Sequence, residues 1–216
     1  MTLIMIIKSL TIGLPKRELF HGKEFLTGMC KQPVKGEVFL SKQGFEGDGV
    51  GDHRHHGGED KAACVYSIDH YPYWGDTLNM TMPTAAFGEN LSVEGMREGD
   101  MCIGDVYRIG TAFVQVSQPR QPCGTLAARY GRDDLLKLVA DSGRTGLYFR
   151  VLTEGLVQAG DIIGLVERDA RGVTVDFANH IFYHDRMNRD GIEKVLAVPA
   201  LSVSWQRSFQ ELRNRL

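Results

Sequence analysis

The distribution of glycine constrains this chain more than any other feature of its sequence. Glycine supplies 25 of the 216 residues, well above the ~7% typical of globular proteins. All but two of these glycines precede residue 167, and only Gly172 and Gly191 follow it. Because glycine adopts backbone conformations that other residues avoid, the chain divides into a region of many tight turns and a differently built C-terminal region. Six glycines crowd between Gly44 and Gly58, which predicts one loop of unusual backbone shape.

The composition excludes several classes of protein. With 43% hydrophobic and 24% charged residues, the chain is typical of a globular protein rather than a disordered one. A formal net charge of -2 gives no support to the binding of a nucleic acid polymer. No apolar run approaches the ~18 residues that cross a membrane, and the first ten residues lack the features of a signal peptide. We therefore expect a cytoplasmic protein that binds neither nucleic acid nor a membrane.

The first 166 residues consist mainly of short apolar or alternating segments separated by turns. Expected strands lie at the start of the chain and at 34–40, 106–109, 113–117, 146–152, 156–158 and 162–166. Segments 106–109 and 113–117 flank a glycine-containing turn, which predicts a hairpin. Residues 125–130 and 133–140 have helical spacing instead. Because glycine lets strands bend sharply, so many short strands predict a closed or nearly closed barrel.

The last fifty residues have a different pattern. Three segments at 176–182, 190–198 and 202–216 predict short helices separated by polar turns. We therefore divide the chain into a barrel domain, residues 1–166, and a three-helix subdomain, residues 167–216. The subdomain is expected to cap the barrel or to mediate an interface, and its amphipathic helices are compatible with a homodimer.

The glycine-rich loop also concentrates groups that could bind a ligand. Three histidines and several acids lie between Gly44 and Lys61, and exposed N–H groups of such a loop can bind an anion. Asp52, His53, His55, His56 and Cys64 suggest a zinc site as one alternative. Zinc sites usually place their ligands at fixed helical or hairpin spacing, and the His-x-His-His run provides no such frame. A structural turn with solvated charges is the other alternative.

Cys123 is the strongest candidate for chemistry among the four cysteines. It follows two prolines, Pro119 and Pro122, which stiffen the segment, and it precedes a predicted helix. The start of that helix and the nearby Arg120 are expected to lower the pKa of the thiol. A thiolate is both a nucleophile and a ligand for soft metals. The other cysteines form no CxxC pair and are interpreted as inert core residues.

Several short motifs, taken together and in order, resemble the MOSC family, named after the C-terminal domain of molybdenum-cofactor sulfurase, and within it the bacterial YiiM-type proteins. The motifs are Lys31–Pro33, Gly44–Asp48, His56–Lys61, Phe87–Leu91 and Gln115–Cys123. This resemblance implies an α+β fold. In the implied fold, a strongly bent mixed sheet forms a β-barrel with peripheral helices, and a small three-helix subdomain follows at the C-terminus.

The resemblance also implies a ligand, the molybdopterin-type molybdenum cofactor. A cysteine at the position of Cys123 is the protein ligand of the metal in this family. Lys31, Asn90 and Arg120 match groups that bind the pterin and its phosphate, while His56 and Asp60 match a loop signature that forms a pocket wall. Amidoxime-reducing relatives carry an arginine just before the asparagine, where this chain has Gly88 and Glu89, so we expect its mode or tightness of phosphate binding to differ.

The implied activity is the reduction of small N-hydroxylated compounds such as N-hydroxylated purine bases or amidoximes. Candidate groups for a proton route are Glu46, Asp48 and Glu89. The sequence contains no flavin, nicotinamide or ferredoxin-type motif, so electrons are expected from a separate reductase. The alternative is a non-catalytic carrier of the cofactor or of sulfur, which uses the same cysteine as a holding ligand or persulfide.

Overall fold

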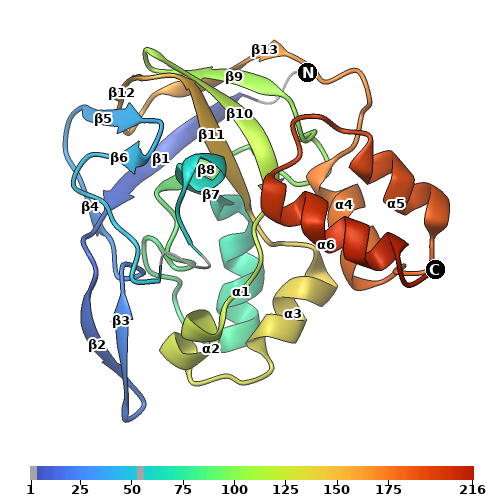
Figure 1. Ribbon diagram of the computed structural model, residues 1–216. Coiled ribbons are helices and arrows are strands. Elements are labelled where there is room, and N and C mark those ends of the chain that lie inside the picture. Colours follow the sequence, from blue (N-terminus) through green and yellow to red (C-terminus); the bar gives the residue numbers. More distant parts are fainter. Residues whose placement is uncertain (1–3, 53–55) are drawn as a thin grey trace.

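A closed mixed β-barrel forms the centre of the molecule in the computed structural model, which describes residues 4–52 and 56–216. The strand order around the barrel is β13-β9-β10-β11-β7-β8-β1, and β1 pairs with β13 to close it (Figure 1). Among the described strands, β7 and β8 form the parallel pair, and the other pairs are antiparallel. The barrel strands are β1 (Met5–Ile12), β7 (Ala63–Ser67), β8 (Leu91–Glu94), β9 (Val106–Ile109), β10 (Ala112–Pro119), β11 (Leu147–Thr153) and β13 (Ile162–Glu167).

Shorter strands and the helices surround the barrel. A hairpin of two strands projects from the body at the lower left of Figure 1. The hairpin strands are β2 (Lys16–Phe20) and β3 (Lys23–Thr27), and the remaining short strands are β4 (Gln32–Pro33), β5 (Val38–Ser41), β6 (Gly44–Phe45) and β12 (Gly155–Val157). The helices are α1 (Tyr71–Leu78), α2 (Gly124–Tyr130), α3 (Leu135–Ser142), α4 (Val175–Tyr183), α5 (Arg189–Leu196) and α6 (Val203–Arg213). In the described part of the chain, none of them is long and apolar enough to cross a membrane.

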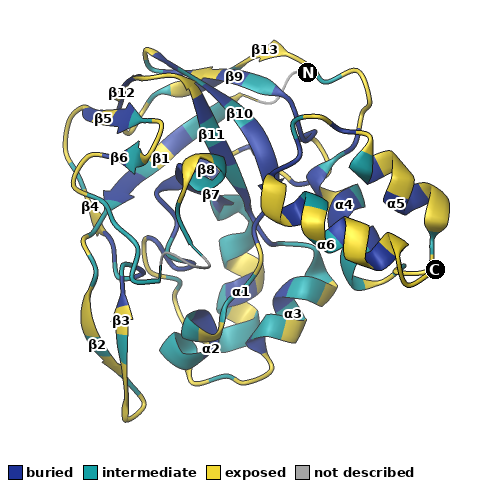
Figure 2. Cartoon of the chain, viewed as in Figure 1, coloured by how far each residue is buried: buried dark blue, intermediate teal, exposed yellow. Residues whose placement is uncertain are grey.

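One hydrophobic core runs through the barrel and into the C-terminal helices. Ile7, Val114 and Phe149 fill the barrel and are fully buried, and Ile192 and Phe209 of α5 and α6 belong to the same cluster. Figure 2 shows the matching pattern, with buried faces turned inward and exposed faces outward on α5 and α6. The tail therefore packs as a direct continuation of the barrel.

The predicted α+β barrel with three C-terminal helices is confirmed. Side chains of Thr174, Asn188 and Ser202 cap α4, α5 and α6 by accepting hydrogen bonds from backbone N–H groups three residues later. The hairpin predicted between 106–109 and 113–117 is also present. The strand predicted over 34–40 is wrong in its first half and begins only at Val38, because Gly36 adopts a φ of 84° and interrupts the extended chain.

Candidate active site

A cavity of about 880 Å³ opens beside the barrel, within the range of roughly 300–1,000 Å³ typical of small-molecule sites. Its walls come from the end of β3, the glycine-rich loop after β6, the strands β7 and β11, and the turn between β10 and α2 (Figure 1). The loop approaches β3 closely, because a Cβ atom on Gly51 would lie 2.1 Å from the Leu26 carbonyl oxygen. Gly44, Gly47 and Gly57 adopt positive φ. Glycine is thus required for both the shape and the packing of this wall.

Cys123 lies at the cavity wall, in the extended residue immediately before α2. Burial alone would raise the pKa of its thiol. A hydrogen bond with His56, the positive charge of Arg120 and the backbone N–H of Leu126 outweigh burial and lower the pKa to about 6. The side chain is therefore mainly a thiolate at neutral pH and is equipped to bind a soft metal.

Arg120 carries a buried hydrogen-bond donor that has no acceptor among the described residues. The residue is only 4% exposed and lines the cavity. Its Nη2 atom donates to the Phe87 carbonyl oxygen over 2.8 Å, whereas Nη1 is buried without a partner. Because an unsatisfied buried N–H is costly, this atom indicates a place for an oxygen or nitrogen atom of a ligand.

Lys31 and Asn90 both line the cavity, as the family resemblance implies, and both are engaged with Asp48. The Lys31 ammonium group pairs with Asp48 Oδ1, and Asn90 Nδ2 donates to Asp48 Oδ2 over 2.8 Å. The backbone N–H of Gly13 also donates to the Asp48 carboxylate over 2.8 Å, and the Asn90 amide oxygen accepts from the Cys64 N–H over 3.0 Å. This network ties four segments of the wall together and commits Asp48 to positioning rather than to proton transfer.

The two residues of the loop signature lie in different surroundings. His56 lines the cavity and contacts Cys123, whereas Asp60 is not part of the cavity lining among the described residues. The Asp60 carboxylate binds the guanidinium group of Arg150 at 2.6 and 3.0 Å and accepts from the backbone N–H of Val203 over 3.0 Å. Asp60 therefore connects the loop to β11 and to the first turn of α6.

The other candidates for a proton route do not line the cavity. Glu46 is exposed. Glu89 is fully buried, where its carboxylate accepts hydrogen bonds from the Tyr71 hydroxyl, the Ser92 hydroxyl and the Phe87 N–H. Glu89 thus shapes the segment that carries Asn90.

Sequence reasoning assigned no role in a molybdenum site to three polar residues of the sheet wall. Cys64, Tyr148 and Gln118 lie directly opposite one another on β7, β11 and β10, and all three line the cavity. Cys64, interpreted from the sequence as an inert core residue, is buried, and burial raises the pKa of its thiol to about 11. The strand register that aligns these residues depends on a β-bulge between Val116 and Gln118, which no short motif reveals.

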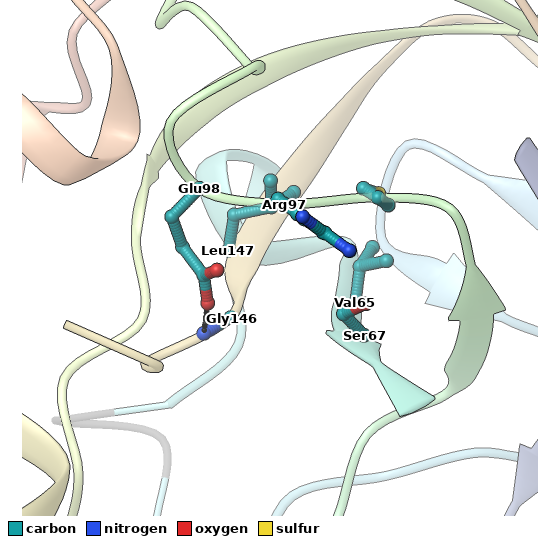
Figure 3. Close-up of a pocket in the computed structure, with 7 residues that line it drawn as sticks. Val65, Ser67, Arg97, Glu98, Gly146 and Leu147 are labelled. Atoms are coloured by element: carbon teal, nitrogen blue, oxygen red, sulfur yellow. Dashed lines mark hydrogen bonds between the residues drawn. The ribbon is translucent and has the colours of Figure 1, made fainter. Parts of the chain in front are cut away.

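A second, much smaller pocket lies between the strand β7, the loop after β8 and the start of β11 (Figure 3). Its volume of about 10 Å³ is roughly the space of one water molecule. Glu98 dominates it, since its carboxylate accepts the Gly146 N–H over 2.8 Å and pairs with His70 at 2.8 Å. The Ser67 hydroxyl beside it has no hydrogen-bond partner among the described residues. The pocket therefore suits an ordered water and is too small for a substrate.

The zinc alternative finds no further support in the described residues. Within these ranges, no group of three or more His, Cys, Asp or Glu side chains converges on a metal site. His53 and His55 lie outside the described residues. His56 contacts the Cys123 thiol instead.

Comparison with known proteins places the chain in a family. The sequence model of the MOSC domain matches residues 52–164, and that of the YiiM-like 3-alpha helix domain matches residues 173–215. Protein YflK of Bacillus subtilis is 48% identical over 208 residues, which covers 96% of this chain and 94% of YflK. The crystal structure of YiiM from Geobacillus stearothermophilus has a TM-score of 0.83 at 39% identity and covers 97% of this chain and 99% of that chain.

A further relative carries a name that refers to activity. A protein of Gibberella moniliformis named Reductase is 38% identical over 154 residues, which covers 68% of this chain and 27% of the fungal protein. Both family models and the full-length relatives agree with the barrel and helical tail described above. The chain therefore belongs to the MOSC domain family and carries the YiiM-like three-helix domain.

Proposed function

We propose that this protein binds a molybdenum cofactor of the molybdopterin type and reduces small N-hydroxylated compounds. The observation that carries the proposal is that one cavity contains both the Cys123 thiolate and the Nη1 atom of Arg120, which has no hydrogen-bond partner among the described residues. Membership in the MOSC domain family and the name Reductase of the fungal relative support it.

The residues of the cavity fit such a cofactor. Cys123 supplies a thiolate, the ligand type that soft metals prefer. Arg120 supplies a buried cationic donor that lacks an acceptor in the described part of the chain, which suits an oxygen of a pterin or phosphate group. Lys31 and Asn90 line the same cavity and are oriented by Asp48. We assign Cys123 to the metal, Arg120 to the organic part of the cofactor, and Lys31 and Asn90 to the wall around it.

The net reaction would convert R–NH–OH, two protons and two electrons into R–NH₂ and water, with the N–O bond broken. When bound, the cofactor supplies the two-electron chemistry of this reduction. The protein holds Cys123 as a thiolate through His56 and Arg120. A separate reductase would provide the electrons, because the sequence has no motif for a flavin or nicotinamide.

The metal content of the purified protein tests this proposal. The chain would be produced in a host that makes molybdopterin, and molybdenum and zinc would be measured per chain. We expect about one molybdenum per chain in the wild type, its loss in Cys123→Ala, and its retention in the control Cys102→Ala, whose thiol lies away from the cavity.

Turnover separates the enzyme from the carrier. With a chemical reductant or a partner reductase, the molybdenum-loaded protein is expected to convert N-hydroxylaminopurine to adenine. Full loading without any turnover would favour the non-catalytic carrier. Stoichiometric zinc without molybdenum, unchanged in Cys123→Ala, would overturn the proposal.

A further inference from the structure

The sheet wall of the cavity presents a row of three polar side chains. Tyr148 of β11 lies directly opposite Cys64 of β7 on one side and Gln118 of β10 on the other. Side chains at opposed positions of neighbouring strands point to the same face of a sheet. The next residue along β11, Phe149, points into the barrel core instead and opposes Val116. The bulge before Gln118 is what brings this amide, rather than Ser117, beside Tyr148.

The Tyr148 hydroxyl is oriented by Cys64. The two side chains are hydrogen-bonded, and burial raises the pKa of both groups, that of Cys64 to about 11. Both therefore remain protonated near neutral pH. In this bond the Tyr148 hydroxyl donates to the Cys64 sulfur, which is a weak acceptor. A stronger acceptor in the cavity can therefore take the phenolic hydrogen bond in its place.

The other neighbour of Tyr148 is held in place by the C-terminal helices. The Gln118 amide oxygen accepts from the Ser204 hydroxyl over 3.0 Å, and its nitrogen donates to the Pro119 carbonyl over 3.1 Å. Ser204 lies in the first turn of α6 and also lines the cavity. Tyr148 thus has fixed neighbours on both sides and lies near the charges of Arg120 and Cys123.

Reduction of an N–O bond releases its oxygen as water, so a donor directed at that oxygen would stabilise the charge that develops there. The cavity-lining groups Lys31 and Asp48 are engaged with each other, and the buried Glu89 lies outside the lining. Tyr148 is a neutral donor in the wall that also contains Cys64, within electrostatic range of Cys123.

We propose that Tyr148 is a further catalytic residue, whose hydroxyl donates a hydrogen bond to the oxygen of the N–O bond in the bound substrate. This role rests on the proposed function and adds a contact to the substrate that the family resemblance does not supply. Gln118 and Cys64 are positioning residues for Tyr148, and Gln118 makes the first turn of α6 part of the same arrangement.

The test is Tyr148→Phe, which keeps the ring and removes only the hydroxyl. Binding of N-hydroxylaminopurine and of adenine would be measured by calorimetry on the molybdenum-loaded protein, without an electron donor. We expect the variant to bind N-hydroxylaminopurine about tenfold more weakly, the effect of one lost hydrogen bond, and adenine with unchanged affinity. In turnover, kcat should fall about 100-fold while the molybdenum content stays at the wild-type level.

Two further variants keep the result decisive. Tyr183→Phe, on α4 and outside the cavity lining, controls for the loss of a tyrosine hydroxyl and should match the wild type. Cys64→Ala, which removes the thiol that orients Tyr148, should weaken binding of N-hydroxylaminopurine alone, by less than Tyr148→Phe does.

Other results overturn this assignment. Equal weakening for both bases would show a general packing role, and unchanged binding with unchanged kcat would show no role for Tyr148. Either result leaves the proposed function standing, because the wild type still binds molybdenum and turns over. A wild type that carries molybdenum but neither binds nor reduces N-hydroxylaminopurine would remove both proposals.

Discussion

Two walls of one cavity differ in whether their polar groups are bound to other groups of the protein. In the loop wall, formed by the segments after β3, after β6 and before β8, Lys31, Asp48 and Asn90 satisfy one another. In the wall formed by the turn before α2, Arg120 keeps a buried donor that has no partner among the described residues, and Cys123 is held as a thiolate. Polar groups that hydrogen-bond to one another stabilise a fold. Buried polar groups that lack a protein partner instead indicate what the site binds.

The two thiols of the cavity express this difference most clearly. Burial raises the pKa of Cys64 to about 11, although Arg120 lowers it in part. Cys123 is partly buried, yet His56, Arg120 and a backbone N–H hold its pKa at about 6. Local donors rather than depth of burial therefore decide which thiol can serve as a metal ligand.

The largest effect is expected from breaking the network of Lys31, Asp48 and Asn90 in the loop wall. Asp48→Ala would leave the Lys31 ammonium, whose side chain is 6% exposed, buried without its counter-charge. We expect the free energy of unfolding, measured with urea, to fall by about 3–5 kcal/mol. Cys123→Ala, in the wall formed by the turn before α2, should lower the free energy of unfolding by less than about 1 kcal/mol. Equal stability of the two variants would contradict the distinction between the walls.

The next effect is the difference in reactivity between the two thiols of the metal-free protein. At pH 7, iodoacetamide should modify Cys123 about 50-fold faster than Cys64, since the larger thiolate fraction outweighs its lower intrinsic nucleophilicity. Mass spectrometry of the digested protein would follow each residue. The Cys123 rate should rise with pH through about 6 and level off above it, because the thiolate is then fully formed. Comparable rates at both residues in the folded protein would refute the contrast.

The smallest effect is expected from removing one hydrogen-bond donor to Cys123. His56→Ala deletes the hydrogen bond to Cys123, so the midpoint of its alkylation profile should move up by about one pH unit. The variant should therefore react more slowly at pH 6 and as fast as the wild type at pH 9. His180→Ala, an exposed histidine of α4, is the matched control. An unmoved midpoint in His56→Ala would assign the low pKa to Arg120 and the backbone alone.

Much of the fold could be predicted from the sequence because its signals are local. The turn between residues 109 and 112 and the capping residues Thr174, Asn188 and Ser202 each act within a few positions of the chain. The hairpin β2–β3 was not predicted. Its leucines, Leu19 and Leu26, lie opposite Glu24 and Arg17 and remain exposed, so it lacks the buried alternation that marks a strand.

The site was predictable only in part. Cys123 and Arg120 could be found because prolines and a helix start flank them in the sequence. The commitment of Asp48 to Lys31 and the row that contains Tyr148 depend on contacts between distant segments and on a bulge in β10. Such pairings arise from strand register, which one sequence does not specify.

The central claim is that Cys123 binds molybdenum and that Arg120 binds the organic part of the same cofactor. A crystal structure of the molybdenum-loaded protein, with data collected on both sides of the molybdenum absorption edge, tests it most directly. We predict an anomalous peak at bonding distance from Cys123 Sγ, and a cofactor atom that accepts a hydrogen bond from Arg120 Nη1. A metal peak away from Cys123, or an Nη1 atom that still lacks an acceptor, would contradict the account.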